Sequence, residues 1–205
     1  RKRSPSLALV LVRNASLIHG IRRGRLGQRK STPWLVCAQH ASFSCSMATL
    51  HFIYGYPGAG KTTLARAIAA SAPAVIFCED EWIATLAEPI TSLQQFVAAS
   101  QRIRSIIKPL AVQILQLGTS VVFDFAGNTP THRAWVRSVF EAAHADHCLH
   151  VLDVSVDEAR QRVQQRNVDK PAGLYFGDVS EAIFDAVLGH IVPPSEAEGF
   201  AVMRG

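Results

Sequence analysis

The stretch IYGYPGAGKTTLA, residues 53–65, decides the fold class of this 205-residue chain. Residues 55–62 match the pattern G-x-x-x-x-G-K-[ST] at every defined position. In such a loop the glycines let backbone N–H groups point inward, and the N-terminus of the following helix adds its positive dipole. Together they form a cradle for anions. The stretch therefore predicts a loop that holds the phosphates of a nucleoside triphosphate.

Each position of this loop has an expected contact. Lys61 should place its ammonium on the β- and γ-phosphates, and the Thr62 hydroxyl should ligate Mg²⁺. An apolar run precedes the loop and a helical pattern follows it, a context that argues against a chance match in a glycine-rich turn. The residues predicted to bind ATP through this loop are Gly55, Tyr56, Pro57, Gly58, Ala59, Gly60, Lys61, Thr62 and Thr63.

Outward from the loop, short apolar runs alternate with longer helical patterns. Strands are predicted at 49–55, 74–78, 120–125 and 148–154, and an edge strand at 199–204. Helices are predicted at 61–71, 92–117, 129–144, 155–167 and 179–191, and Pro109 should kink or split the second of them. Thr129 and Ser155 should cap the N-termini of the third and fourth of these helices. Near-continuous apolar strands between helices indicate an α/β fold, with a mostly parallel sheet covered by helices on both faces. This is the three-layer sandwich of P-loop NTPases.

The charge of the chain is unevenly distributed. The formal net charge is +5, but residues 1–46 hold nine Lys or Arg and no acidic side chain. The other 159 residues carry 12 basic and 16 acidic side chains, a net charge of −4. A basic nucleic-acid-binding surface is therefore not expected on residues 47–205, which we predict to be one P-loop kinase domain.

Three interpretations compete for the basic leader, residues 1–46. Its Arg- and Ser-rich, acid-free composition is typical of an organellar transit peptide. It can also be a basic arm for nucleic acid or membrane. We favour the third, in which this segment is upstream sequence ahead of a true start at Met47, two residues before the first predicted strand.

The spacing of the cysteines and the hydropathy of the chain indicate its cellular compartment. Four cysteines lie far apart without a CxxC pair, so neither zinc spacing nor a disulfide framework is present. No apolar run approaches the roughly 20 residues that span a bilayer. A cytoplasmic protein without a membrane partner, monomeric or weakly dimeric, is expected.

Two carboxylates follow predicted strands, where ligands of a parallel α/β sheet bind. Asp80 stands in FCEDEW after the second strand and is predicted to accept the proton of an attacking hydroxyl, or to bind that hydroxyl. The alternative for this stretch is a solvated acidic turn that caps the next helix. Asp124, in VVFDF at the end of the third strand, matches the Walker B pattern and should hold Mg²⁺ through a bound water or orient the acceptor.

Arginines are expected to balance charge on the transferring phosphoryl group. Arg162 and Arg166 share a helix face at i, i+4 and precede a Gly-containing loop, as in a lid that closes over phosphates. A solvated basic face is the alternative. Arg133, in the first turn of its helix, is predicted to contact the bound nucleotide, and the alternative is a position on the surface. The eight histidines show no ligand spacing, so we expect no metal site among His144, His147 and His150.

With these residues in place, residues 47 to about 201 resemble the small P-loop kinases often called AAA-domain ATP-binding proteins. Relatives in that group are the polynucleotide 5′-hydroxyl kinase domain, chloramphenicol phosphotransferase and the zeta toxins. The resemblance rests on GYPGAGKTT, EDEW, VVFDFAGNTPTHRAW, LHVLDV, RQRVQQRN and VPPSEAEGF. In that group a serine usually precedes the acidic pair, where this chain has Cys78.

The resemblance implies roles for particular residues. It implies an acceptor-binding role for Asp80. It also matches Asp124 to an Asp that ends the third strand in that group, and Arg133 to an Arg that starts the next helix. It also implies that Arg162 and Arg166 are lid arginines. The resulting expectation is a kinase that transfers the γ-phosphate of ATP to a hydroxyl of a small molecule or a nucleic-acid end, with Mg²⁺. An ATP-hydrolysing switch without an acceptor is the alternative.

Overall fold

The computed structural model describes residues 48–86 and 93–205 of the chain. These residues lie within one compact unit, Ser44–Gly205. The predicted leader, residues 1–46, falls outside the described residues, and so does the boundary at Met47.

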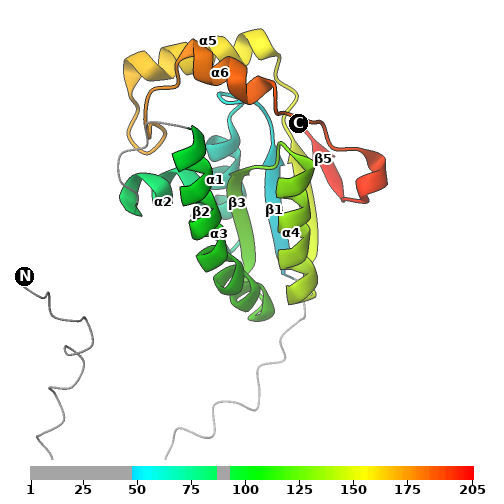
Figure 1. Ribbon diagram of the computed structural model, residues 1–205. Coiled ribbons are helices and arrows are strands. Elements are labelled where there is room, and N and C mark those ends of the chain that lie inside the picture. Colours follow the sequence, from blue (N-terminus) through cyan, green and yellow to red (C-terminus); the bar gives the residue numbers. More distant parts are fainter. Residues whose placement is uncertain (1–47, 87–92) are drawn as a thin grey trace, which may run out of the picture. The chain divides into compact units, whose positions relative to one another are not determined.

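One five-stranded sheet organises the unit, and all of its strands are parallel (Figure 1). The strand order is β2-β3-β1-β4-β5, so the strand that leads into the phosphate loop is central. The bounds are β1 Thr49–Tyr54, β2 Ala74–Cys78, β3 Ser120–Ala126, β4 Asp146–Val151 and β5 Val202–Arg204. The predicted α/β class is confirmed, and β5 is the edge strand that was expected.

The central strands are buried on both faces, as their continuous apolar sequence predicts. Val121, Val122 and Phe123, in consecutive positions of β3, are all fully buried. The predicted fourth strand was misplaced by two residues at its start and three at its end. The strand begins earlier than predicted because Asp146, its polar first residue, pairs with Thr49 in the parallel ladder. A pattern of apolar residues does not record such a backbone partner.

Helices cover both faces of the sheet. Helix α1 (Lys61–Ser71) lies behind the sheet in Figure 1, and α3 (Leu93–Gln116) and α4 (Pro130–Ala143) lie in front of it. The larger core, which includes Phe52, Ile107 and Val139, fills the space between the sheet and the α3–α4 pair. A smaller core joins α1 to the sheet through Ala65 and Ile53.

Helix α3 runs through Pro109 without ending, so the predicted split is wrong. A proline inside a helix costs about 3 kcal/mol, because it removes one hydrogen bond and crowds the preceding turn. Ile103, Ile107 and Leu115 of the same helix are each at most 4% exposed. Burying each such side chain stabilises by about 1.5–3 kcal/mol, so packing outweighs the proline.

Three further helices complete the unit. Helix α2 (Glu79–Leu86) follows β2 directly, and α5 (Val156–Asp169) and α6 (Glu181–Leu188) cross the carboxyl ends of the strands, at the top of Figure 1. The predicted caps are present, because the side chains of Thr129 and Ser155 accept the backbone N–H three residues on. No helix in residues 48–86 or 93–205 is both long and apolar enough to traverse a bilayer.

Candidate active site

The phosphate loop connects β1 to α1 at the carboxyl edge of the sheet, as predicted. Gly58 and Gly60 have φ angles of 81° and 100°, a left-handed region that side chains rarely adopt. At Gly58 a Cβ atom would also lie 2.4 Å from the backbone oxygen of Ala159 in α5. Glycine is therefore required at position 58 both by the backbone angle of the turn and by the close contact between the loop and α5.

The buried side chain of Asn128 holds the loop at its first residue. Its Oδ1 accepts from the Gly55 N–H at 3.1 Å, and its Nδ2 donates to the Gly55 carbonyl at 2.9 Å. Lys61 Nζ also donates to the Gly55 carbonyl, at 3.0 Å, and to that of Tyr56, at 2.9 Å. Asn128 thus ties the end of β3 to the loop, a role that the sequence did not reveal.

Two adjacent carboxylates of FCEDEW, those of Glu79 and Asp80, have different surroundings. Glu79 is buried and accepts from Arg104 Nε at 2.8 Å and from the Ser100 hydroxyl, so it fastens α2 to α3. Asp80 instead interacts electrostatically with Lys61 and remains open to solvent. Desolvation of the carboxyl group by the surrounding protein is the largest cause that raises the pKa of Asp80, and the Glu79 charge raises it further. The Lys61 ammonium opposes both effects. Of the two, only Asp80 interacts electrostatically with the loop lysine.

Asp124 lies at the end of the third strand, beside the same lysine. It is 8% exposed, and its Oδ2 has no hydrogen-bond partner among the described residues. Burial lowers the pKa of Lys61, and the nearby charges of Asp124 and Asp80 raise it. Cys78, the register partner of Asp124 on β2, has a pKa raised to about 12, chiefly by burial, so the thiol stays neutral.

The two predicted lid arginines differ in position. The Arg166 charge acts on both Lys61 and Asp80, and its buried Nε has no partner among the described residues. Arg162 is half exposed and forms an ion pair with Glu158, one turn earlier, at 2.6 Å. The structure therefore brings Arg166 to the site and leaves Arg162 on the solvated face of α5.

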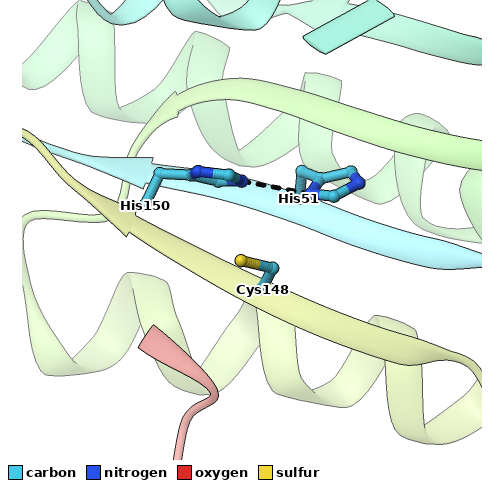
Figure 2. Close-up of side chains that lie close together, drawn as sticks. All are labelled: His51, Cys148 and His150. Carbon is cyan, nitrogen blue, oxygen red and sulfur yellow. Dashed lines mark hydrogen bonds between the residues drawn. The ribbon is translucent and has the colours of Figure 1, made fainter. Parts of the chain in front are cut away.

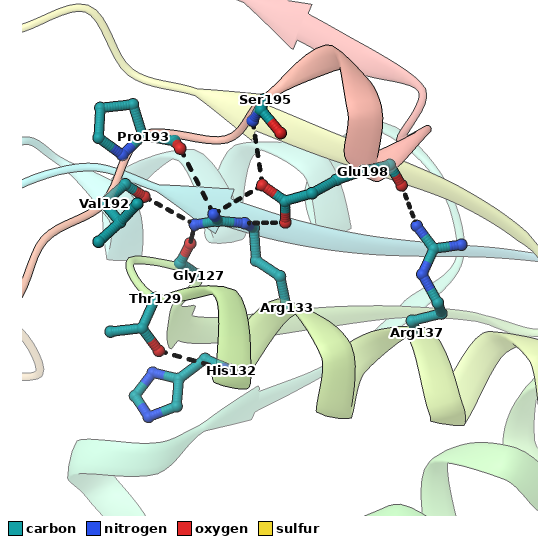
Figure 3. Close-up of polar contacts among 9 residues, drawn as sticks. All are labelled: Gly127, Thr129, His132, Arg133, Arg137, Val192, Pro193, Ser195 and Glu198. Carbon is teal, nitrogen blue, oxygen red and sulfur yellow. Dashed lines mark hydrogen bonds and ion pairs between the residues drawn. The ribbon is translucent and has the colours of Figure 1, made fainter.

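Arg133 does not face the phosphate loop with a free guanidinium, which corrects its predicted nucleotide contact. It is fully buried and forms a double ion pair with Glu198, at 2.7 and 2.8 Å (Figure 3). Its remaining N–H groups donate to the carbonyls of Gly127, Val192 and Pro193. Arg133 thus anchors the segment before β5 to the end of β3, which sequence spacing could not indicate.

Replacing Glu198 with alanine should lower the free energy of unfolding by about 3 kcal/mol, because it leaves the buried Arg133 charge uncompensated. Denaturant unfolding measures this effect. Glu196→Ala, which removes an exposed carboxylate two residues away, should stay within about 0.5 kcal/mol of the wild type. Equal effects of the two substitutions would contradict the role of Glu198 as the partner that compensates the buried Arg133 charge.

The same ion pair gives an expected pH dependence. The hydrogen bond from Arg133 lowers the pKa of Glu198 below its ordinary value of 4.5. The pair therefore stabilises the fold fully above about pH 4.5, and this contribution is lost as the pH falls through the lowered pKa. Glu198→Ala should show a correspondingly weaker loss of stability in acid.

A hollow of about 300 Å³ adjoins the phosphate loop on the β4 side. Tyr56 of the loop lines it, together with the residues that follow β4 and the pair Pro193–Pro194. Arg133 donates hydrogen bonds to the carbonyl of Pro193 and to that of Val192, the residue before it. The Arg133 network therefore also positions one wall of this hollow.

The donor set fits ATP and Mg²⁺. Oxygen ligands suit Mg²⁺, and the Thr62 hydroxyl with the partnerless, buried Asp124 Oδ2 provides them. The partnerless Arg166 Nε and the ammonium of Lys61 suit the oxygens of a phosphate group. These residues, with Asp80, can hold a triphosphate and leave one carboxylate for a second substrate.

A family model described as "AAA domain" matches residues 50–194. No curated protein matches the chain by sequence. Solved structures do share the fold. A candidate kinase from Chloroflexus aurantiacus is 18% identical, with a TM-score of 0.60, covering 78% of this chain and 85% of that one.

Two other solved structures have similar scores. Kti12 of Chaetomium thermophilum, in complex with ADP-AlF3, is 16% identical, with a TM-score of 0.55, covering 76% of this chain and 88% of that one. A chain of the Pnkp1/Rnl/Hen1 RNA repair complex is 18% identical, with a TM-score of 0.55, covering 70% of this chain and 44% of that one. At these identities the likeness establishes the fold alone, an α/β fold of the P-loop NTPase type.

Proposed function

Because this chain belongs to the AAA-domain family whose model it matches, we propose that it is an ATP-dependent kinase. It transfers the γ-phosphate of ATP to a hydroxyl group of a small molecule or of a nucleic-acid end. One observation carries this proposal: Lys61, Asp80, Asp124 and Arg166 act on one another electrostatically at the carboxyl edge of the sheet, next to the phosphate loop. A protein that only bound ATP would not need Asp80 there.

Each of these residues has a part in the proposed transfer. The loop amides and Lys61 hold the phosphates, and Arg166 balances the charge that builds up on the transferring group. Thr62 and Asp124 would hold Mg²⁺, which supplies further positive charge at the phosphate oxygens. Asp80 binds the acceptor hydroxyl and takes its proton as the new P–O bond forms and the bond between the γ-phosphorus and ADP breaks. Catalysis then consists of positioning and electrostatics.

The base and ribose of ATP are assigned to the hollow beside Tyr56. This hollow continues from the phosphate loop, and it lies on the β4 side of β1, whereas Asp80 follows β2 on the other side. The nucleotide and the acceptor would therefore approach the γ-phosphate from opposite sides of the loop. This arrangement leaves room for an in-line displacement.

The proposal is tested by incubating the protein with γ-labelled ATP and a panel of acceptors. The panel contains sugars and nucleosides, hydroxyl-bearing antibiotics, and oligonucleotides with a 5′-hydroxyl. We expect label in one class of organic phosphate ester. Label that appears only in inorganic phosphate, whatever the acceptor, would favour the ATP-hydrolysing switch and contradict the kinase.

Arg166→Ala should lower kcat/KM for ATP turnover by about 10²–10³-fold, the usual cost of removing one charged group that stabilises a transition state. Arg162→Ala is the matched control on the same helix, and it should change kcat/KM by less than about twofold because its guanidinium pairs with Glu158. Steady-state kinetics of both variants measure the difference. Equal losses, or no loss at Arg166, would remove Arg166 from the mechanism.

A further inference from the structure

Strands β1 and β4 bring together three metal-ligating side chains outside the candidate active site (Figure 2). His51 of β1 and Cys148 of β4 are register partners in the parallel ladder. His150 lies two residues along β4, and alternate residues of a strand point to the same face. The adjacent residues of both strands, Phe52 and Leu149, pack into the core against α3 and α4. The three side chains therefore share the opposite face of the sheet.

This face is covered only in part. The smaller core of α1 lies over neighbouring residues such as Ile53 and Val122. His150 is buried, but His51 and Cys148 keep intermediate exposure. A solute from solvent can therefore reach His51 and Cys148, and the surrounding strands hold all three side chains in place.

The donor atoms are nearly spaced for one metal ion. His51 Nδ1 and His150 Nε2 lie 3.1 Å apart, and the three donor atoms, with Cys148 Sγ, all lie within 4.8 Å of one another. Ligands at ordinary Zn²⁺ bond lengths in a tetrahedron are roughly 3.3 Å apart for two nitrogens and roughly 3.6 Å for nitrogen and sulfur. A small rotation of the cysteine side chain is enough to close the set.

Metal binding requires a rearrangement of protons among the three side chains. Two neutral imidazoles share one proton across their 3.1 Å contact. A metal ion would take the place of that proton, which moves to the other nitrogen of its ring. The Cys148 thiol would lose its proton to solvent, which balances the binding.

We propose that His51, Cys148 and His150 form a zinc site with three protein ligands and a fourth position open to water. Two imidazoles and a thiolate are ligands that Zn²⁺ prefers, whereas Mg²⁺ requires oxygen ligands. The site is therefore chemically distinct from the one at Thr62 and Asp124. One ligand comes from β1 and two come from β4, so the bound ion joins the strand of the phosphate loop to its neighbour.

The sequence did not reveal this site. The stretch HADHCLH offers several histidines, but His147 stacks on Phe140 with ring centroids 4.2 Å apart and accepts from the Ala201 N–H. The third ligand, His51, lies about a hundred residues earlier in the chain. Only the pairing of β1 with β4 brings it to Cys148.

The test uses the full chain, reduced and freed of metal by a chelator, and then titrated with Co²⁺ as a spectroscopic substitute for Zn²⁺. We expect one equivalent to bind with a thiolate-to-cobalt charge-transfer band and tetrahedral d–d bands, and Zn²⁺ to displace it. Cys148→Ser should lose the charge-transfer band. His51→Gln should weaken Zn²⁺ binding at least about tenfold in competition with an indicator dye.

Matched controls separate this site from other ligands of the chain. Cys37→Ser combined with Cys45→Ser, and His190→Gln at an exposed position two residues after α6, should keep the band and the affinity. Zn²⁺ should also raise the Tm of the wild type and not that of Cys148→Ser, provided that the metal-free variant unfolds cooperatively. A charge-transfer band that persists in Cys148→Ser, or the absence of any such band in the wild type, would overturn the proposal.

Discussion

Lys61→Ala is expected to abolish the rise in Tm that ATP·Mg²⁺ gives the wild-type protein. The Lys61 ammonium is the cation of the phosphate loop, and its position is fixed by the carbonyls of Gly55 and Tyr56. Without it, the loop amides alone face the β- and γ-phosphates, and ATP turnover should fall by at least about 10³-fold. Thermal unfolding with and without ATP·Mg²⁺ measures the first effect, and phosphate release measures the second.

The control for this variant removes an equal charge elsewhere. Lys108→Ala on α3 deletes an ammonium that donates to Ser138, on the face of the sheet that α1 does not cover. Its ATP-induced rise in Tm should equal that of the wild type. Because Lys61 also braces the loop, the nucleotide-free Tm of each variant is the reference. A Lys61→Ala protein that kept the full rise would disprove the loop assignment.

Asp80→Asn is expected to stop phosphoryl transfer while ATP binding stays within about threefold of the wild type. The substitution keeps the shape of the side chain but removes its ability to accept a proton, which typically costs about 10²–10⁴-fold in rate. Asp80 faces Lys61 but is not part of the loop. Transfer rates and calorimetric ATP affinity, measured on the same preparation, separate the two effects.

The raised pKa of Asp80 gives this residue a signature in the pH profile. A carboxyl group acts as a base only when it is ionised, so the transfer rate should fall as the pH drops through that raised value. Glu81→Gln, at the next and exposed position, should leave rate and profile unchanged. Loss of transfer in Glu81→Gln, or its survival in Asp80→Asn, would refute the assigned role.

Local signals in the sequence predicted the parts of the molecule that depend on neighbouring residues. The phosphate loop, the helix at 61–71 and the caps at Thr129 and Ser155 follow from contacts within four residues, and all are present. The strand at 74–78 and its parallel neighbours follow from apolar runs that are buried on both faces. Helix α3 differs because tertiary burial, which the sequence does not display, outweighs Pro109.

The polar side chains of the site were harder to assign, because their partners are distant in sequence. Asn128 bonds Gly55 across 73 positions, and Arg133 bonds Glu198 across 65. No motif records a partner so far away, so the sequence predicted no role for Asn128 in the loop and no ion pair for Arg133. Glu79 and Asp80 are adjacent and both acidic, and only the position of Arg104 on α3 distinguishes the structural one from the functional one.

The most direct test of phosphoryl transfer to a hydroxyl is to run the reaction in water enriched in ¹⁸O. The protein is incubated with ATP·Mg²⁺ and the acceptor class found in the screen, and the products are resolved by ³¹P NMR. A kinase predicts a phosphate ester that contains no ¹⁸O from the solvent, formed in step with ADP and lost in Asp80→Asn. Inorganic phosphate carrying ¹⁸O as the sole product, at the same rate with and without acceptor, would contradict it.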